Sequence, residues 1–581
     1  MHRLRLYPQL EPGKKLDSLL GSAHDERNAI SFKKIRDADE AEEYPEEMLQ
    51  HLYSMRLQDY LVPKSQGGLL NNFEEMGFIL RIISQRDLSL GLSFCMPFLG
   101  ACPAWIAEQD YTVTLTKNLI LDGKRIAMCL TEHGHGSDLL ADECYATQQE
   151  NDVLITGKKW LINHATKAQA YMVFASDDNR HKPRSYSFYM IDKGYLNQSN
   201  YRTYPKIRTH GVRGADMGAV EFNQIQVPIK TRIGKSGQGL EILLKVFNIT
   251  RSVAPCLALG ATDTALRIGM TFALERKLYR QSVFDIPHAR TTLVNTFCNY
   301  LVAECCSILS LRTLNFYPEK SAFYSSICKY LVPTQCELIL ADLAKIIGAR
   351  YYLRDEYYSG MFQKILRDVP LISFGDGNSL VNLHSILLQM NSVFGQVNNT
   401  CHPVTPDFFD LTQPPPDIAL NNITLSCHKG DIAFSAFLKY MTAISIYFND
   451  DSISSLLAEL GKQINQLVTW IQSRTASLPY QEPYSWFEKA KKFCLLQALC
   501  STVLFWYFNH KDSTSLFSKT SILTYILNHN LYSEQEISEE LINEIAIELE
   551  YRTKNHKLYS VYPFETAAGK SDDLIQPVSV S

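Results

Sequence analysis

The chain has 581 residues, of which 46% are hydrophobic and 20% charged, and its formal net charge at pH 7 is −4. This length allows about two to four domains with a large buried core. The small negative charge gives no basic field, which argues against nucleic acid as the main partner. The 14 cysteines show no spacing suited to zinc, so we expect reduced, mostly buried thiols and no metal site.

The most apolar stretch is residues 88–107, which contain no charged side chain and are long enough to span a bilayer. Pro97 and Pro103, together with two glycines, would interrupt a single helix. We predict the end of a buried helix, a bend and a second buried element, and hence no membrane span. Neither end of the sequence resembles a secretory or peroxisomal signal, and we expect a cytoplasmic protein.

The first 123 residues have apolar residues at helical intervals, most clearly in 44–60 and 73–85, and predict a helical domain over 1–123. From residue 124 to 235 the apolar period changes to two, which is typical of a small antiparallel barrel or sandwich. The predicted strands are 126–131, 143–148, 152–162, 170–176, 186–193, 204–208 and 219–227.

Helical patterns return from residue 236 and predict a second helical domain over 236–397. The Pro- and Asn-rich residues 398–423 predict a linker. Five more helices are predicted at 430–449, 452–474, 484–509, 515–529 and 533–552, followed by a loose polar tail. The predicted fold is therefore of the α+β class and mostly α, with a central β domain and an extra helical domain within 398–581.

The segment from Arg125 to Ala165 places polar loop residues beside a strand that carries a tryptophan. An apolar run, residues 126–130, leads into Thr131-Glu132 and the loop Gly134-His135-Gly136-Ser137-Asp138. Glycines and small polar residues suggest backbone that passes close to a ligand, with N–H groups and hydroxyls available to bind it. A strand pair then runs to Trp160 and Asn163 at the same end of the sheet. An ordinary surface hairpin explains the pattern equally well.

This segment resembles the flavin-facing segment of acyl-CoA dehydrogenases, which usually reads T-E-P-x-x-G-S-D and later G-x-K-x-W-I-T-N. The matching residues are Thr131-Glu132, Gly136-Ser137-Asp138, Gly157-x-Lys159 and Ile162-Asn163. His133 replaces the proline, Asn163 replaces the threonine that bonds the flavin, and the tryptophan stands one place early. The resemblance implies a bound FAD, held by Cys129, Leu130, Thr131, Gly136, Ser137, Ile162 and Asn163, with Ser137 also near the substrate.

Two later segments extend the resemblance into a domain that the family folds as a four-helix bundle. Leu274-Glu275-Arg276-Lys277 resembles the family's A-x-E-R-x-x-F-G, whose arginine reaches the FAD diphosphate across a subunit interface. This implies that Arg276 binds a neighbouring subunit's FAD in a homodimer or homotetramer, since a guanidinium forks onto phosphate oxygens. A solvated surface charge is the alternative. Gly348 stands where the family has a Gly-Gly turn at FAD, with Ala349 as the second residue.

Residues 367–378 resemble the family's R-D-x-x-x-x-x-x-x-E-G-T, which carries the catalytic base. An ungapped count places Asp376 on the catalytic glutamate and Asn378 on a FAD-binding threonine. A second register follows the E-G-D-N-T of acyl-CoA oxidases, places Gly375 at the base position and leaves no carboxylate. Some branches of the family carry the base immediately before an arginine that corresponds to Arg251 in this chain. Thr250 occupies that place here and cannot act as the base. The resemblance also implies that Arg251 contacts the substrate. Asp376 also fits a plain Asp-Gly turn.

The resemblance implies an oxidoreductase of fatty acid metabolism that removes two hydrogens across Cα–Cβ of an acyl thioester. The chemistry needs a base for the α-proton and a flavin for the β-hydride, since no side chain accepts hydride. The substrate would be an acyl-CoA or an acyl carrier protein ester, and the electron acceptor a flavoprotein or oxygen. Two alternatives stay open: a degenerate flavin-binding scaffold for partner proteins, and an acyl-CoA oxidase, which the extra helical domain suggests.

Overall fold

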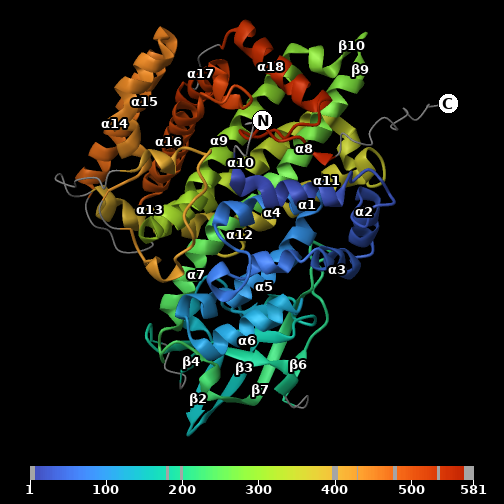
Figure 1. Cartoon of the computed structure of the whole chain (residues 1–581), viewed down its shortest axis with the longest axis vertical. Helices are drawn as coiled ribbons and strands as arrows, with labels where there is room; N and C mark the ends of the chain where they lie inside the picture. Colours follow the sequence, from blue (N-terminus) through green and yellow to red (C-terminus); the bar gives the residue numbers. More distant parts are fainter. Residues whose placement is uncertain are drawn as a thin grey trace.

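The computed structural model describes residues 7–177, 182–195, 200–394, 404–427, 430–474, 481–532 and 537–567. Figure 1 shows a helical body with the larger β-sheet gathered at one end of the molecule. Helices dominate the described chain, and this sheet is formed by the middle of the sequence. The predicted fold class is confirmed.

Six α-helices make up the N-terminal layer of the described chain. They are α1 (Glu11–Leu20), α2 (Phe32–Glu40), α3 (Glu46–Ser54), α4 (Phe73–Arg86), α5 (Leu88–Ala107) and α6 (Asp110–Leu121). Asn72 accepts the N–H of Glu75 at the start of α4, and Asp87 accepts those of Ser89 and Leu90 at the start of α5. These caps fix the turn that joins two buried helices.

The predicted bend within residues 88–107 is wrong, because α5 is one helix of 20 residues that contains Pro97 and Pro103. Each proline removes a backbone hydrogen bond. However, α5 is buried against α4, α7 (Gly239–Val253) and β1 (Ile126–Cys129), and this packing outweighs the lost bonds. Gly100 makes the contact with the sheet possible, since a Cβ there would lie 2.6 Å from the carbonyl oxygen of Ile126.

The middle of the chain forms an eight-stranded mixed sheet in the order β6-β7-β3-β2-β4-β5-β8, with β1 also paired to β4. The strands after β1 are β2 (Tyr145–Gln149), β3 (Asp152–Asn163), β4 (Ala170–Asp177), β5 (Tyr186–Asp192), β6 (Tyr201–Thr203), β7 (Met217–Pro228) and β8 (Arg232–Ile233). The pairs β1–β4 and β2–β4 are parallel, a departure from the antiparallel expectation. The predicted strand at 204–208 is wrong: Pro205 has no N–H to donate, and β6 ends before it.

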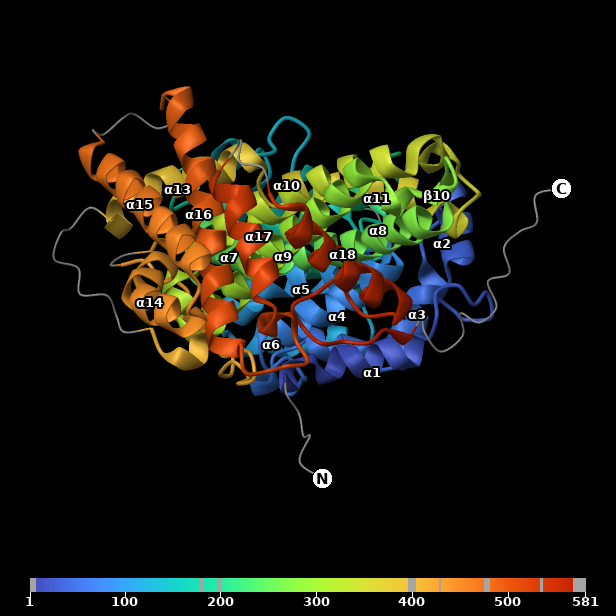
Figure 2. The ribbon, with the colours of Figure 1, turned by 90° about the horizontal axis from the view of Figure 1, so that it is seen from above.

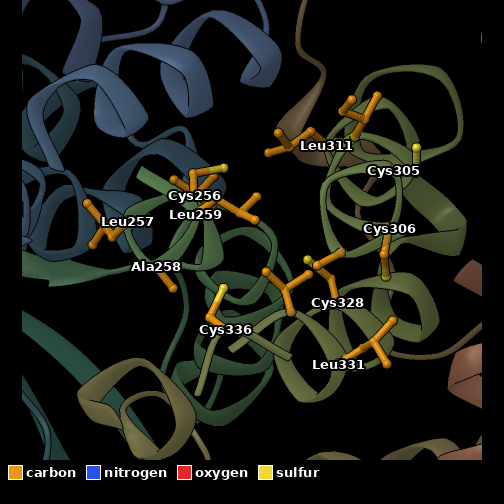
Figure 3. Packing of buried hydrophobic residues seen from close by; sticks show 14 of the residues in the cluster. Cys256, Leu257, Ala258, Leu259, Cys305, Cys306, Leu311, Cys328, Leu331 and Cys336 are labelled. Carbon is orange, nitrogen blue, oxygen red and sulfur yellow. The ribbon is translucent and has the colours of Figure 1, made fainter. Parts of the chain in front are cut away.

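Helices of very different length pack as a bundle above this sheet in the view of Figure 1. They are α7, α8 (Pro255–Glu275), α9 (Pro287–Phe316), α10 (Ser321–Ile347), α11 (Met361–Asp368), α12 (Pro370–Phe374) and α13 (Ser379–Phe394). Figure 3 shows Cys256, Cys306 and Cys328 among the apolar side chains packed between α8, α9 and α10. Every cysteine in the described residues is buried and outside any disulfide, which confirms the expected burial of the thiols for that part of the chain.

Three helical stretches are long and apolar enough to cross a membrane by length and composition alone. They are residues 88–107, 239–275 and 287–316. In each of them, 83% of the most apolar window is buried inside the protein.

Five helices beyond residue 430 pack against the bundle. They are α14 (Ala433–Phe448), α15 (Asp451–Ser473), α16 (Tyr484–Asn509), α17 (Thr520–Leu531) and α18 (Glu539–Lys554). Figure 2 shows α14, α15 and α16 on one side of the molecule, and α17 and α18 pack on α9. All five predicted helices are present. Residues 533–536, within the last predicted helix, and 568–581, most of the predicted tail, lie outside the described residues.

Arg312 on α9 holds part of the predicted linker to the helical layers. Its side chain is fully buried and forms a 2.8 Å ion pair with Glu74 of α4. The guanidinium also donates to the carbonyl oxygens of four linker residues, Asp407, Phe408, Asp410 and Gln413. One side chain therefore ties the linker to α4 and α9 together.

Replacement Arg312→Met should lower the free energy of unfolding by about 3–5 kcal/mol, because Glu74 would stay buried without its cation. The four linker carbonyls would lose their donor as well. Chemical denaturation checks this against Arg27→Met, which removes an exposed cation paired with Asp25. Equal midpoints for the two variants would contradict the anchoring role of Arg312.

Candidate functional site

The loop that follows β1 is anchored by Lys159, a fully buried residue of β3. Its ammonium lies 2.8 Å from Glu132 Oε1, 2.5 Å from Asp142 Oδ2 and 3.0 Å from a loop carbonyl oxygen. Glu132 also accepts the N–H groups of Glu143 and Cys144, at 2.7 and 2.9 Å. Both ends of the loop, near residues 132 and 142, are therefore bound to one strand.

Sequence reasoning identified Lys159 only as a motif match and missed this role. A signal was available, because Val153, Ile155, Gly157 and Lys159 alternate along β3. Val153 and Ile155 lie in the sheet core, so a lysine in the same phase of the strand must be buried. A buried ammonium requires a carboxylate nearby. The acids of the preceding loop were the available candidates.

One ammonium serves two carboxylates in this cluster, and they respond differently. Burial opposes the ionisation of Glu132, but Lys159 and two backbone N–H groups outweigh it and hold the pKa of Glu132 below its usual value. At Asp142 burial is the larger effect and raises the pKa to about 7 despite the attraction of Lys159. The cluster thus combines one fixed ion pair with one acid that titrates near neutrality.

A cavity of about 470 Å³ lies against this loop. Its wall combines Glu132, His133, Gly134 and His135 of the loop with Lys158 and Trp160 of β3 and with Tyr204 and Ile207 after β6. A Cβ added at Gly134 or Gly136 would meet no atom within 4 Å, so both glycines border open space. The volume falls within the range of about 300–1,000 Å³ that is usual for small-molecule sites.

Asn163 ends β3 with two polar atoms that have no partner. Just before it, the register of β3 against β7 shifts between Lys159 and Ile162, and Leu161 has φ +54°. Both Oδ1 and Nδ2 of Asn163 are buried and bond no described residue. An unsatisfied buried polar group costs about 1–3 kcal/mol. A bound group that offers a donor and an acceptor would satisfy both atoms.

The next residue, His164, is fully buried and neutral. Burial, assisted by the nearby Arg125, lowers the pKa of His164 to about 3. Its Nε2 lies 3.0 Å from the hydroxyl of Tyr44, and the tautomer of the neutral ring decides which of the two groups donates. Nδ1 has no hydrogen-bond partner among the described residues.

Asp376 lies in the turn between α12 and α13, partly buried, with φ +55° and followed by Gly377 at φ +101°. Arg251, near the end of α7, donates from Nε to the carbonyl oxygen of Asp376 at 3.0 Å. Asp376 also acts on α5: burial raises the pKa of Cys95 to about 12, and the charge of Asp376 adds to the rise. The charge of Asp376 is therefore felt by Cys95 on α5 and by Arg251 on α7.

The other predicted site residues fall into separate environments. Thr131 and Leu130 are partly buried at the start of the loop, and Gly136 and Ser137 are exposed on it. Cys129 and Ile162 have buried side chains in the sheet core, so any contact with a ligand would come from their backbone. Asn378 accepts the N–H of Val381 at 2.9 Å and so caps the start of α13.

A second cavity, of about 550 Å³, brings Arg276 and Gly348 together at the ends of α8 and α10. Lys345 and Arg350 also line it, and Gly348 has φ +65° with no atom within 4 Å of an added Cβ. Three cations around open space suit an anionic group such as a phosphate. No residue lines both cavities, and none of the predicted cofactor contacts at residues 129–131, 136–137 and 162–163 lines the first one.

Two family models match the chain: acyl-CoA dehydrogenase, middle domain, over residues 127–225, and acyl-CoA dehydrogenase, C-terminal domain, over residues 237–390. These residues match two successive domains of the acyl-CoA dehydrogenase family. The probable medium-chain specific acyl-CoA dehydrogenase 2 of Caenorhabditis briggsae is 22% identical over 351 residues, which cover 59% of this chain and 82% of that protein.

A second relative is subunit CarC of the caffeyl-CoA reductase-Etf complex of Acetobacterium woodii, 21% identical over 60% of this chain and 90% of that protein. Among solved structures, the FAD-complexed acyl-CoA dehydrogenase of Bacillus anthracis matches with a TM-score of 0.66 at 15% identity. It covers 94% of this chain and 89% of that one, so the likeness of fold extends into the C-terminal helices. The prolyl acyl carrier protein oxidase AnaB matches 65% of this chain and 97% of its own, with a TM-score of 0.60 at 17% identity.

Replacement Glu132→Gln should lower the free energy of unfolding by about 3–5 kcal/mol, because Lys159 would lose its ionised partner. Asp142→Asn should be much milder at pH 7, since the pKa of about 7 leaves that carboxyl only partly charged. Chemical denaturation of both variants at pH 7 checks the contrast. Equal losses would contradict the division of roles in this cluster.

The same pair predicts a pH dependence. Because the pKa of Asp142 is raised from 3.8 to about 7 in the folded state, the native protein holds an extra proton between these values. Its contribution to stability is present at low pH and is lost as the pH rises through about 7. The melting temperature of the wild type relative to Asp142→Asn should therefore fall from pH 4 to pH 7. A constant difference would contradict the raised pKa.

Proposed function

We propose that this protein is an FAD-dependent dehydrogenase that oxidises an acyl thioester across its Cα–Cβ bond. The observation that carries the proposal is the cavity beside loop residues 132–135, together with the buried and unbonded amide of Asn163. A flavin ring carries N–H and carbonyl groups, so it would match both atoms of that amide. Thr131, Gly136 and Ser137 would hold the cofactor beside it. The open space at Gly136 leaves room for this.

In this proposal Asp376 takes the α-proton of the substrate. FAD, when bound, would supply the hydride acceptor that no side chain provides. The backbone N–H of Asp376 would donate to the thioester oxygen, where negative charge develops as the proton leaves. Aspartate is one methylene shorter than the family's glutamate, so the position of the turn must bring the carboxylate to the substrate. The hydrogen bond from Arg251 to the Asp376 carbonyl fixes that position.

We also propose that two copies of the chain complete each cofactor site. The support is that Arg276, Lys345 and Arg350 gather around a cavity separate from the loop cavity. A second copy would place these cations against the phosphates of a cofactor held by the first copy's loop. The substrate handle in the proposal is coenzyme A or an acyl carrier protein, and the electron acceptor is a flavoprotein.

Anaerobic titration of the purified protein with a panel of CoA and carrier-protein esters tests the reaction. We expect a bound yellow cofactor that is bleached by at least one ester. Asp376→Asn should slow bleaching by about 10²–10⁴-fold, because a general base contributes that much. Asp417→Asn, which removes an exposed carboxylate in the linker, should have no effect.

Other outcomes separate the alternatives. Peroxide release in air would favour an oxidase. The likeness to AnaB, an oxidase, is the reason to measure it. A protein with bound FAD that no ester bleaches would favour a flavin-binding scaffold. A protein that binds no FAD after reconstitution would contradict the proposed function altogether.

The fit at Asn163 gives a test that does not depend on turnover. Asn163→Leu should lower the FAD-to-protein absorbance ratio after dialysis, because leucine offers the cofactor no hydrogen bond. Asn163→Thr should retain more cofactor, since a hydroxyl can both donate and accept. Equal retention by the two variants would contradict a contact between residue 163 and FAD.

A further inference from the structure

Two buried cations flank the turn that carries Asp376. Lys329 on α10 is 1% exposed and Arg251 on α7 is 8% exposed. Within the described residues neither has a carboxylate oxygen within 4 Å of its nitrogens. Other buried cations, such as Arg81, Lys159, Arg312 and Lys364, each have such a partner. The charges of Lys329 and Arg251 must therefore be stabilised by other interactions.

Both cations bind the backbone of this turn. The ammonium of Lys329 donates to the carbonyl oxygen of Ile372 and lies 3.5 Å from that of Gly377. Arg251 donates to the carbonyl oxygen of Asp376 between them. The carbonyl oxygens of Ile372, Asp376 and Gly377 thus face two positive charges that come from different helices.

The backbone of the turn is adapted to this arrangement. Consecutive positive φ values at Asp376 and Gly377 turn the carbonyls toward the cations. A Cβ at residue 377 would lie 2.8 Å from the guanidinium of Arg251, and the φ of +101° there is one that residues other than glycine rarely adopt. Asn382 of α13 also donates to the carbonyl oxygen of Gly377, at 2.9 Å.

Among the described residues, Asp376 is the carboxylate whose charge favours the charged form of both cations. Burial lowers the pKa of Arg251 to about 10 and that of Lys329 to about 8, and in each case the charge of Asp376 opposes the shift. Arg251 adds to the lowering at Lys329, and Cys328 opposes it slightly. The carboxylate thus offsets part of the cost of burying two positive charges, although it touches neither.

We propose that Lys329 and Arg251 are positioning residues that clamp the turn on both sides of Asp376, with the Asp376 carboxylate as their counter-charge. The clamp fixes where the carboxylate leaves the turn and places its negative charge beside α5. Naming Asp376 a base rests on the proposed function, whereas the coupling between Lys329 and Asp376 does not. The two can therefore fail separately.

A double-mutant cycle of thermal melts, Lys329→Met against Asp376→Asn, tests the coupling without any substrate. In the wild-type background Asp376→Asn should lower the melting temperature by at least about 2 °C, because the buried cations lose their counter-charge. In the Lys329→Met background the same change should have less than half that effect. The control cycle with Lys462→Met, an exposed residue of α15 paired with Glu459, should be additive.

Additive melting shifts in the Lys329 cycle would overturn the proposal. If Lys329→Met does not fold, Lys329→Arg takes its place. Asp376→Asn should then lower the melting temperature by the same amount in the wild type and in the Lys329→Arg variant, because both keep the cation. An unequal shift would also overturn the proposal. Where an ester bleaches the flavin, Lys329→Met should lower the bleaching rate at saturating ester. The ester concentration that gives half of the maximal rate should change little. Lys329→Arg should restore the rate. Coupling without bleaching would leave this inference standing and remove the proposed reaction.

Discussion

A buried ammonium is stable only where carboxylates or carbonyls surround it, and the site is built around the buried Lys159. Its pairing with Glu132 and Asp142 binds both ends of a loop whose middle is exposed and rich in glycine. The same strand continues through a bulge to Asn163. Loop, cavity wall and unbonded amide therefore share one support. The loop residues in between need no contacts of their own to stay in place.

The turn at Asp376 depends on the same kind of constraint, applied by helices that are distant in sequence. Arg251 and Lys329 approach it from α7 and α10, and Cys95 lies near it on α5. The C-terminal part of the chain holds these layers together. Tyr559 and Val561 donate their N–H groups to Asp263 and Glu304, two buried acids of α8 and α9. Together with the linker contacts of Arg312, this makes the segments before and after the extra helices part of the support of the bundle.

In the proposed assignment, the departures from the family pattern keep a hydrogen-bonding group at residue 163 and a carboxylate at residue 376. Asn163 retains a hydrogen-bonding side chain where a threonine is usual, and Asp376 retains a carboxylate where a glutamate is usual. Ala349 adds only a methyl group beside Gly348, which borders open space. At these positions the changes thus alter reach and shape more than charge.

The sequence by itself determined most of the elements and the resemblance to a family. Apolar periodicity placed α4, β3 and α16 within a residue or two of their bounds, because these patterns are local. It failed where distant parts decide the outcome. Prolines in α5 are tolerated because neighbouring helices bury it, and β1 pairs in parallel with β4, a strand some forty residues away.

The motif spacing likewise predicted Thr131, Asn163, Arg276 and Asp376 as site residues but gave no role to Lys159 or Lys329. Only the tertiary structure assigned those roles. The free energy of a buried charge depends on how deeply it is buried and on which acids and carbonyl oxygens contact it. The residues adjacent in sequence determine neither of these.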